Sequence, residues 1–154
     1  MDAEANWTKW GAAVYQAAGL TLVGIGQHQI IPIMPIVAPM LEPAVARSDG
    51  HWAIWDVAAA LASGSMHLWL ALDGDEPVAA CTTAVVTYPR ARVLQIVFMG
   101  GRHLDRMLEL LPFFEDHARV MQCAQVEEWG RPGWQGVLKA AGWRVGKIVM
   151  TKDL

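Results

Sequence analysis

The most constraining feature of this sequence is a long stretch near its N-terminus that carries no charge. Between Lys9 and Glu42 there is no Asp, Glu, Lys or Arg, whereas residues 66–154 carry ten acidic and ten basic side chains. Apolar surface of this extent has to be covered by the rest of the chain, by a partner or by a membrane. We therefore expect this part of the chain to be buried or to dock on another chain.

A membrane helix is the first alternative to consider for this stretch. Residues 20–41 have the required length, since a span needs about 20 apolar residues. Their content argues against a span, because polar side chains lie in the middle and prolines would interrupt the helix repeatedly. These residues are Gln27, His28 and Gln29, and Pro32, Pro35, Pro39 and Pro43. We expect no membrane span, and no signal peptide, because the N-terminus has no cationic region.

The composition fits one globular domain and excludes several functions. The chain has 154 residues, of which 54% are hydrophobic and 18% charged, enough apolar material for a core. With 12 Lys and Arg against 15 Asp and Glu, it lacks the basic excess that a nucleic-acid partner requires. Cys81 and Cys123 show no metal-ligand spacing, and a domain of this size needs no disulfide, so we expect a reducing compartment such as the cytoplasm.

The N-terminal half is predicted to contain three helices and one strand. Over residues 3–18, Trp7, Trp10, Val14 and Ala18 follow helical spacing, and Gly19 would close this helix. Residues 28–33 favour a strand. Residues 37–47 can be helical only if the prolines fall near a helix start or a kink. Residues 54–62 are rich in alanine and predict a helix that ends at Ser63 and Gly64.

The second half predicts alternating strands and helices. Residues 67–72, 77–88 and 92–99 predict three strands of an antiparallel meander, with turns at residues 73–75 and 89–91. Residues 104–122 have helical spacing, with a kink or break expected at Pro112. A strand over 124–129, a short helix over 134–141 and a last strand over 143–151 complete the prediction.

This order of elements resembles the GCN5-related N-acetyltransferase (GNAT) fold from about Gln29 to Leu154. Residues 130–143, GRPGWQGVLKAAGW, look like the GNAT segment in which a short helix ends in a glycine and an aromatic residue before the final strand. Together with residues 68–72 and 93–104, they are similar to small GNAT-like proteins encoded by bacteriophages, some of them virion-associated. The resemblance implies an α+β fold, a GNAT-like mixed sheet with an antiparallel meander and flanking helices. Residues 1–28 would form an N-terminal appendage and residues 29–154 the GNAT-like domain.

In catalytic members of this family, a glycine-rich loop after the third of these strands holds the pyrophosphate of acyl-CoA. Its glycines let backbone N–H groups approach the anion at the start of the next helix. If acyl-CoA binds here, the corresponding residues are Gly100, Gly101, Arg102 and His103. The two glycines come early in the loop. The carboxylate of Asp105 would repel the anion, and the positive charges of Arg102 and Arg106 would partly offset this repulsion. Alternatively, the glycines only turn a strand into a helix, with Asp105 as a cap residue.

The usual acid and base of acetyl transfer are also missing, so no catalytic residue is assigned. The strand over 93–99 contains no carboxylate, and the helix over 134–141 contains no tyrosine. Glu127 and Glu128 are neighbours on a strand and point to opposite faces, so that one of them either faces a cleft or is solvated. The five histidines (His28, His51, His67, His103 and His117) show no chelating spacing, and we expect no metal.

The excess of tryptophan and methionine, eight of each, indicates a protein interface. We expect the N-terminal segment to provide it through Trp7, Trp10, Val14, Leu20, Leu22 and Ile25. The leading hypothesis is a non-catalytic phage protein without a cofactor that binds other virion proteins or itself, in the virion or the host cytoplasm. The alternative is an acetyl-CoA-dependent N-acetyltransferase that modifies a protein or a small amine.

Overall fold

The computed structural model describes residues 7–129 and 132–154. Within them, one sheet contains seven strands in chain order. Neighbouring strands are antiparallel except for the last pair, which is parallel. The strands are β1 (Trp7–Thr8), β2 (Gly11–Ala17), β3 (Leu20–Ile25), β4 (His67–Asp73), β5 (Glu76–Tyr88), β6 (Ala91–Gly101) and β7 (Gln125–Glu128).

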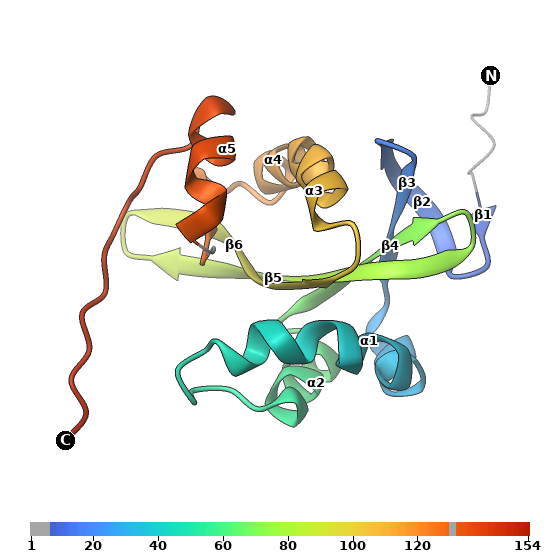
Figure 1. Cartoon of the computed structure of the whole chain (residues 1–154), viewed down its shortest axis with the longest axis horizontal. Coiled ribbons are helices and arrows are strands. Elements are labelled where there is room, and N and C mark those ends of the chain that lie inside the picture. Colours follow the sequence, from blue (N-terminus) through green and yellow to red (C-terminus); the bar gives the residue numbers. More distant parts are fainter. Residues whose placement is uncertain (1–6, 130–131) are drawn as a thin grey trace.

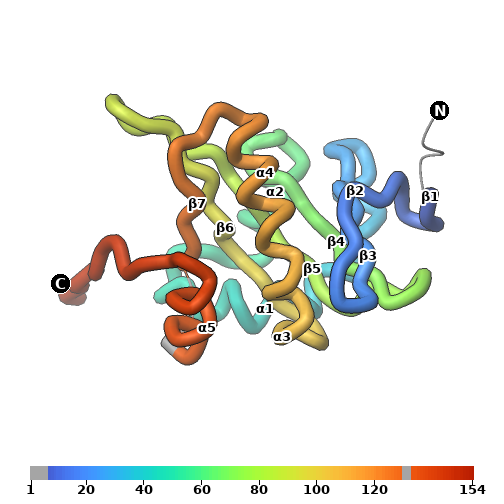
Figure 2. The backbone as a smooth tube through the Cα atoms, turned by 90° about the horizontal axis from the view of Figure 1, so that it is seen from above, coloured from blue at the N-terminus to red at the C-terminus, as the bar shows by residue number. Residues whose placement is uncertain are grey.

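The helices cover both faces of this sheet (Figure 1). They are α1 (Ile30–Ala46), α2 (Ile54–Ser63), α3 (Leu104–Met107), α4 (Leu111–Val120) and α5 (Gln135–Ala140). One core cluster lies between the sheet and α1 and α2, and a second lies between the sheet and α3 and α4. Seen from above, β1 to β3 lie at one side of the molecule and β7 with α5 at the other (Figure 2). The mixed α+β fold that the sequence predicts is confirmed.

The helix predicted over residues 3–18 is wrong in the part that the structure describes, and its first residues lie outside that part. Residues 11–25 form the hairpin β2–β3 instead, with both turn residues at positive φ, Ala18 at 51° and Gly19 at 74°. Positive φ at two consecutive residues is typical of a tight hairpin turn. β3 pairs with β4, so residues 7–25 extend the sheet formed by the rest of the chain.

The strand predicted over residues 28–33 is also wrong, because α1 begins at Ile30 and includes the prolines. The prolines inside α1 follow one another at intervals of four residues and are all exposed: Pro35, Pro39 and Pro43. A proline removes the N–H that would bond the carbonyl four residues earlier. Here the orphaned carbonyls lie along one outer face, where water can satisfy them. The opposite face is buried against the sheet through Ile33, Val37, Leu41 and Val45.

This arrangement explains the uncharged stretch. Residues 27–46 are long and apolar enough, by length and composition, to cross a membrane, but in this structure they pack on the sheet with a third of the segment buried. β3 is covered by helices on one face and by aromatic side chains on the other. Its sequence is therefore mostly apolar and does not alternate between apolar and polar residues. The expected cover is therefore supplied largely by the chain itself.

The second half follows the prediction until its last segment. The meander β4–β5–β6 and the helix α2, with Gly64 at φ 83° as its cap, are confirmed. The long helix breaks as expected, because a 3₁₀ turn (Leu108–Leu110) separates α3 from α4 and Pro112 lies in the first turn of α4. The strand expected over 143–151 is wrong, since residues 143–154 have no regular structure here.

Candidate functional site

The parallel strands β6 and β7, the last pair in the sheet order, part from each other after a short run of pairing. Their register runs from Val93 opposite Gln125 to Ile96 opposite Glu128. β7 then ends, whereas β6 continues to Gly101. A pocket with a volume of about 80 Å³ lies where the strands separate, lined by β6 from Ile96 to Met99, by the end of β7 and by the C-terminal end of α1.

A β-bulge in β6 lies at the same point. Thr82 of β5 pairs with Phe98, and Thr83 pairs with Ile96, so Val97 is the extra residue. The backbone N–H of Phe98 donates a hydrogen bond of 3.1 Å to the buried hydroxyl of Thr82. A bulge bends its strand and increases the local twist. The bulge therefore turns β6 away from β7 and opens the pocket.

The described residues that line this pocket include one acidic side chain, Glu128, and one basic side chain, Arg47. Glu128 is the last residue of β7, and its Oε2 atom is buried with no hydrogen-bond partner among the described residues. Burial raises the pKa of its carboxyl group from 4.5 to about 7. The sequence left open whether one of the two adjacent glutamates faces a cleft or is solvated. The structure places Glu128 in the pocket, beside Trp129, Trp134 and Ser48.

Gly100 and Gly101, which would hold acyl-CoA if this cofactor binds, are both explained by close packing inside the protein. A Cβ atom at Gly100 would overlap the backbone carbonyl of Met40 in α1. Gly101 has φ 120°, and a Cβ atom there would overlap the backbone of Val78 and Ala79 in β5. Only glycine fits at either position. The glycines thus allow the end of β6 to pass between α1 and β5.

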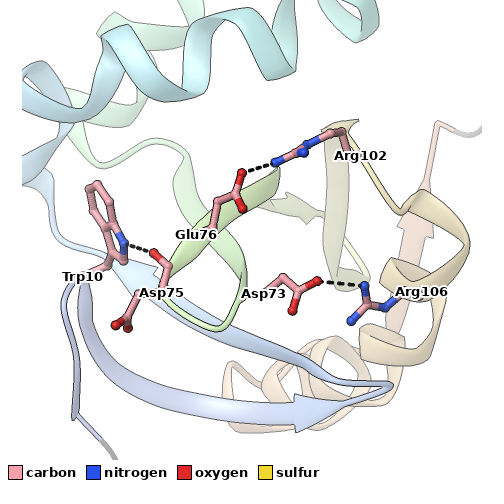
Figure 3. Close-up of polar contacts among 6 residues, drawn as sticks. All are labelled: Trp10, Asp73, Asp75, Glu76, Arg102 and Arg106. Carbon is pink, nitrogen blue, oxygen red and sulfur yellow. Dashed lines mark hydrogen bonds and ion pairs between the residues drawn. The ribbon is translucent and has the colours of Figure 1, made fainter.

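The two arginines of the following loop are tied to acidic residues of the β4–β5 turn (Figure 3). Arg102 Nη2 lies 2.6 Å from Glu76 Oε1, with both side chains mostly exposed. Arg106 Nη1 lies 3.2 Å from Asp73 Oδ2, and its Nε donates a hydrogen bond of 2.9 Å to the carbonyl of Ala18. The second arginine therefore joins α3 to the N-terminal hairpin.

His103 begins the helical segment in a left-handed conformation, with φ 58° and ψ 40°. The N–H groups of the first helical turn have no acceptor within a helix, so the amides of the next two residues are donors available to an anion. The carboxylate of Asp105 lies in the same turn, as the sequence indicated. The loop thus combines backbone donors and one exposed cation, Arg102, with two competing negative charges, Asp105 in the same turn and Glu76, which is paired with Arg102.

The six residues predicted as an interface do not form one surface. Leu20, Leu22 and Ile25 are buried in the core of this chain, because β3 lies inside the sheet rather than in an appendage. Trp10 is partly buried, and its indole N–H donates to the carbonyl of Asp75 over 2.9 Å (Figure 3). Trp7 and Val14 are exposed.

The histidines do not converge with other ligands. In residues 7–129 and 132–154, no three His, Cys, Asp or Glu side chains form a group that could hold a metal ion. The ring of His117 stacks on Phe113 and contacts Trp69 edge-on. Burial, with a smaller effect of His67, lowers the pKa of His117. These contacts describe a partly buried histidine that packs against aromatic side chains.

The sequence matches no protein family model and no curated protein. The structure, however, is similar to those of several acetyltransferases. A predicted acetyltransferase with acetyl-CoA from Clostridium acetobutylicum aligns with a TM-score of 0.62 and 12% identity, over 87% of this chain and 96% of that one. An aminoglycoside acetyltransferase from an uncultured soil metagenomic sample, in complex with sisomicin, aligns with a TM-score of 0.61 and 11% identity, over 88% of this chain and 97% of that one.

A GNAT family acetyltransferase from Staphylococcus aureus aligns with a TM-score of 0.59 and 11% identity, over 88% of this chain and 99% of that one. At these identities the similarity concerns the fold alone. The seven-stranded, mostly antiparallel sheet of the described residues, with helices on both faces, is therefore the GNAT acetyltransferase fold.

Proposed function

We propose that this protein is an acyl-CoA-dependent N-acetyltransferase in which Glu128 is the general base. The observation that carries the proposal is a part-buried carboxyl group with a pKa of about 7 in a pocket where two parallel strands separate. A general base is most effective when its pKa lies near the working pH. Perturbed carboxyl groups in pockets are candidates for function. The shared fold supports the proposal without specifying the reaction.

Acyl-CoA fits the groups around this pocket. The N–H of Phe98 faces β5, so by alternation the N–H and C=O of Met99 face the side where β7 has ended. Such groups can hold the amide-containing arm of the cofactor. The amides at the start of α3 can hold its pyrophosphate, in spite of Asp105, and so can the exposed Arg102 once it exchanges its ion pair with Glu76 for the anion. When bound, the cofactor supplies an acyl group activated as a thioester.

The chain's own residues then prepare the acceptor. The Glu128 carboxylate takes a proton onto an oxygen atom from the ammonium group of the acceptor, which leaves a neutral and nucleophilic amine. Trp129 and Trp134 line the same pocket. Because the pKa of Glu128 is about 7, the carboxylate form becomes the major one above that pH.

Calorimetry with coenzyme A and acetyl-CoA tests the first half of this proposal. We expect micromolar binding. Release of free coenzyme A is then measured with a panel of primary amines that includes polyamines, aminoglycosides and lysine peptides. Glu128→Gln should leave cofactor binding intact and abolish the transfer, whereas Glu127→Gln, on the opposite face of β7, should retain both. Absence of heat at millimolar coenzyme A would refute the proposal.

A second candidate is a non-catalytic component of a bacteriophage particle or of its assembly. This candidate is supported by Gly100 and Gly101, because the packing of β6 alone accounts for glycine at both positions. The exposed Trp7, Trp55 and Trp129 provide apolar surface for a partner. Mass spectrometry of purified virions and assembly intermediates tests this role, and absence of the protein from all of them would contradict it.

A further inference from the structure

The pocket between β6 and β7 is lined by two side chains of opposite charge. Glu128 belongs to the end of β7, and Arg47 directly follows the C-terminal end of α1. The Oε2 atom of Glu128 is buried and has no hydrogen-bond partner among the described residues, so Arg47 does not bind this atom. A buried carboxylate oxygen without a donor is costly. A ligand that brings a donor to this oxygen would remove that cost.

The pKa of Glu128 also indicates that the two charges lie apart. A cation in contact with a carboxylate lowers the pKa of that group. The pKa of Glu128 is instead raised to about 7, and the cause is burial. The guanidinium group of Arg47 therefore does not neutralise this carboxyl group, and a ligand can lie between the two.

The end of α1 fixes the backbone that carries Arg47. The N–H of Arg47 donates to the carbonyl of Ala44 over 3.1 Å, and the N–H of Ser48 donates to that of Val45 over 3.0 Å. The Ser48 hydroxyl in turn accepts the N–H of Trp52 over 3.2 Å, which holds the loop that follows. Arg47 itself is exposed at the rim of the pocket.

The size of the pocket limits what can reach Glu128. Its volume is about 80 Å³. One water molecule requires roughly 10–15 Å³ of such volume, so the pocket takes roughly five to eight atoms other than hydrogen. A small charged group fits, and a folded or bulky one does not.

We propose that this pocket binds the head group of a free α-amino acid, with its carboxylate on Arg47 and its ammonium group on Glu128. The ammonium nitrogen, the α-carbon and the carboxylate together have this size. Arginine presents two parallel N–H donors to a carboxylate. The ammonium group supplies the donor that Glu128 Oε2 lacks. A lysine side chain or an aminoglycoside offers an ammonium group without an adjacent carboxylate, so Arg47 would distinguish amino acids from those amines.

In the proposed transferase the bound amino acid is the acceptor, and this part of the inference rests on the proposed function. Glu128 takes one proton from the ammonium group. The nitrogen then forms a bond to the acyl carbon while the bond from that carbon to sulfur breaks. A second proton leaves the nitrogen and protonates the released thiolate. The products are an N-acetyl amino acid and coenzyme A, and Glu128 returns its proton to water.

Calorimetry of the chain, with and without coenzyme A, tests the binding of amino acids directly. The two ligands compared are leucine and 3-methylbutylamine, which is leucine without its carboxylate. We expect leucine to bind with an about tenfold lower Kd than the amine, because it gains one charged contact at an exposed arginine. Equal affinities would overturn the proposal. Absence of heat with leucine in both conditions would overturn it as well.

Variants of Arg47 identify the group that recognises the carboxylate. Arg47→Gln should abolish the tenfold preference for leucine, and Arg47→Lys, which keeps the charge without the planar fork, should restore part of it. Arg119→Gln removes a positive charge from α4, outside this pocket, and is the matched control that should keep the full preference. Circular dichroism shows whether each variant is folded. A preference that survives in folded Arg47→Gln would overturn the proposal.

Release of coenzyme A from acetyl-CoA with the same two acceptors separates this inference from the proposed function. A higher kcat/KM for leucine than for 3-methylbutylamine would support both. If leucine binds but neither acceptor is acetylated, the transferase is refuted and the amino-acid site stands. If 3-methylbutylamine is acetylated as well as leucine or better, the amino-acid acceptor is refuted and the transferase stands.

Discussion

Replacing Glu128 with glutamine should stabilise the protein at alkaline pH and not at acidic pH. Burial raises the pKa of this carboxyl group from 4.5 to about 7 in the folded chain. Between these two values the folded state binds more protons than the unfolded state, so stability falls as the pH rises. Below this window the carboxyl group is protonated in both states, and the destabilising effect disappears. Glutamine carries no charge at any of these pH values, so the variant escapes the effect.

The magnitude follows from the two pKa values. The difference between 4.5 and about 7 corresponds to about 3 kcal/mol, at about 1.4 kcal/mol for each pH unit. Because the carboxyl group is only part-buried and solvent screens its charge, we expect a smaller net effect of about 1–2 kcal/mol. The variant should therefore unfold at a higher urea concentration than the wild type above about pH 8, and the two should converge near pH 4.

Urea unfolding followed by tryptophan fluorescence at several pH values measures this difference. Glu127→Gln removes the same charge from the opposite face of β7 and is the matched control. A stability difference between Glu128→Gln and wild type that is the same at every pH would refute the reasoning. So would a difference that grows toward acidic pH. If the expected difference is found, the ionised carboxyl group of Glu128 costs stability at the pH at which the proposed reaction needs it.

Three further predictions concern the strands around the pocket and the loop beyond it. Gly100→Ala should destabilise the protein by at least about 2 kcal/mol in urea unfolding, because the added methyl group meets a backbone carbonyl. The control Gly133→Ala places its methyl group in open space and should change stability by less than about 0.5 kcal/mol. Thr82→Val should cost about 1–3 kcal/mol in thermal unfolding, since the buried N–H of Phe98 loses its acceptor; an unchanged melting temperature would contradict this. Arg102→Ala should change stability by less than about 1 kcal/mol, because the ion pair of Arg102 is exposed. The same variant should bind coenzyme A severalfold more weakly in calorimetry. Unaltered affinity would show that Arg102 is not part of the proposed site.

The elements that the sequence predicts well are those with strong local signals. The meander β4–β6 is bounded by turn residues on both sides, and the break at Pro112 follows from the missing N–H of proline. The errors occur where the local signal fits two structures. The spacing of Trp7, Trp10 and Val14 suits a helix, but the pairing of β2 with β3 and of β3 with β4 stabilises strands there.

The candidate site was only partly visible in the sequence. The adjacent glutamates left open whether one of them faces a cleft or is solvated, and the sequence carries no signal for the place where β6 and β7 separate. That place depends on a bulge at Val97 and on the hydroxyl group of Thr82, which lies 16 residues from its donor. The glycines of the loop were visible, but Gly100 packs against Met40 on a distant helix, and Gly101 packs against β5.

The sequence alone indicates that the uncharged N-terminal third has to be covered, and it predicts the order of strands and helices between residues 54 and 141, because periodicity, turn residues and helix breakers act over a few neighbouring residues. The resemblance of this order to a known fold implied the α+β class. The tertiary structure alone decides that three prolines share the outer face of α1, that Glu128 is part-buried and that β7 keeps an open edge. Solvent exposure, a carboxyl pKa and strand pairing depend on atoms that are distant in the sequence, so they exist only once the chain has folded.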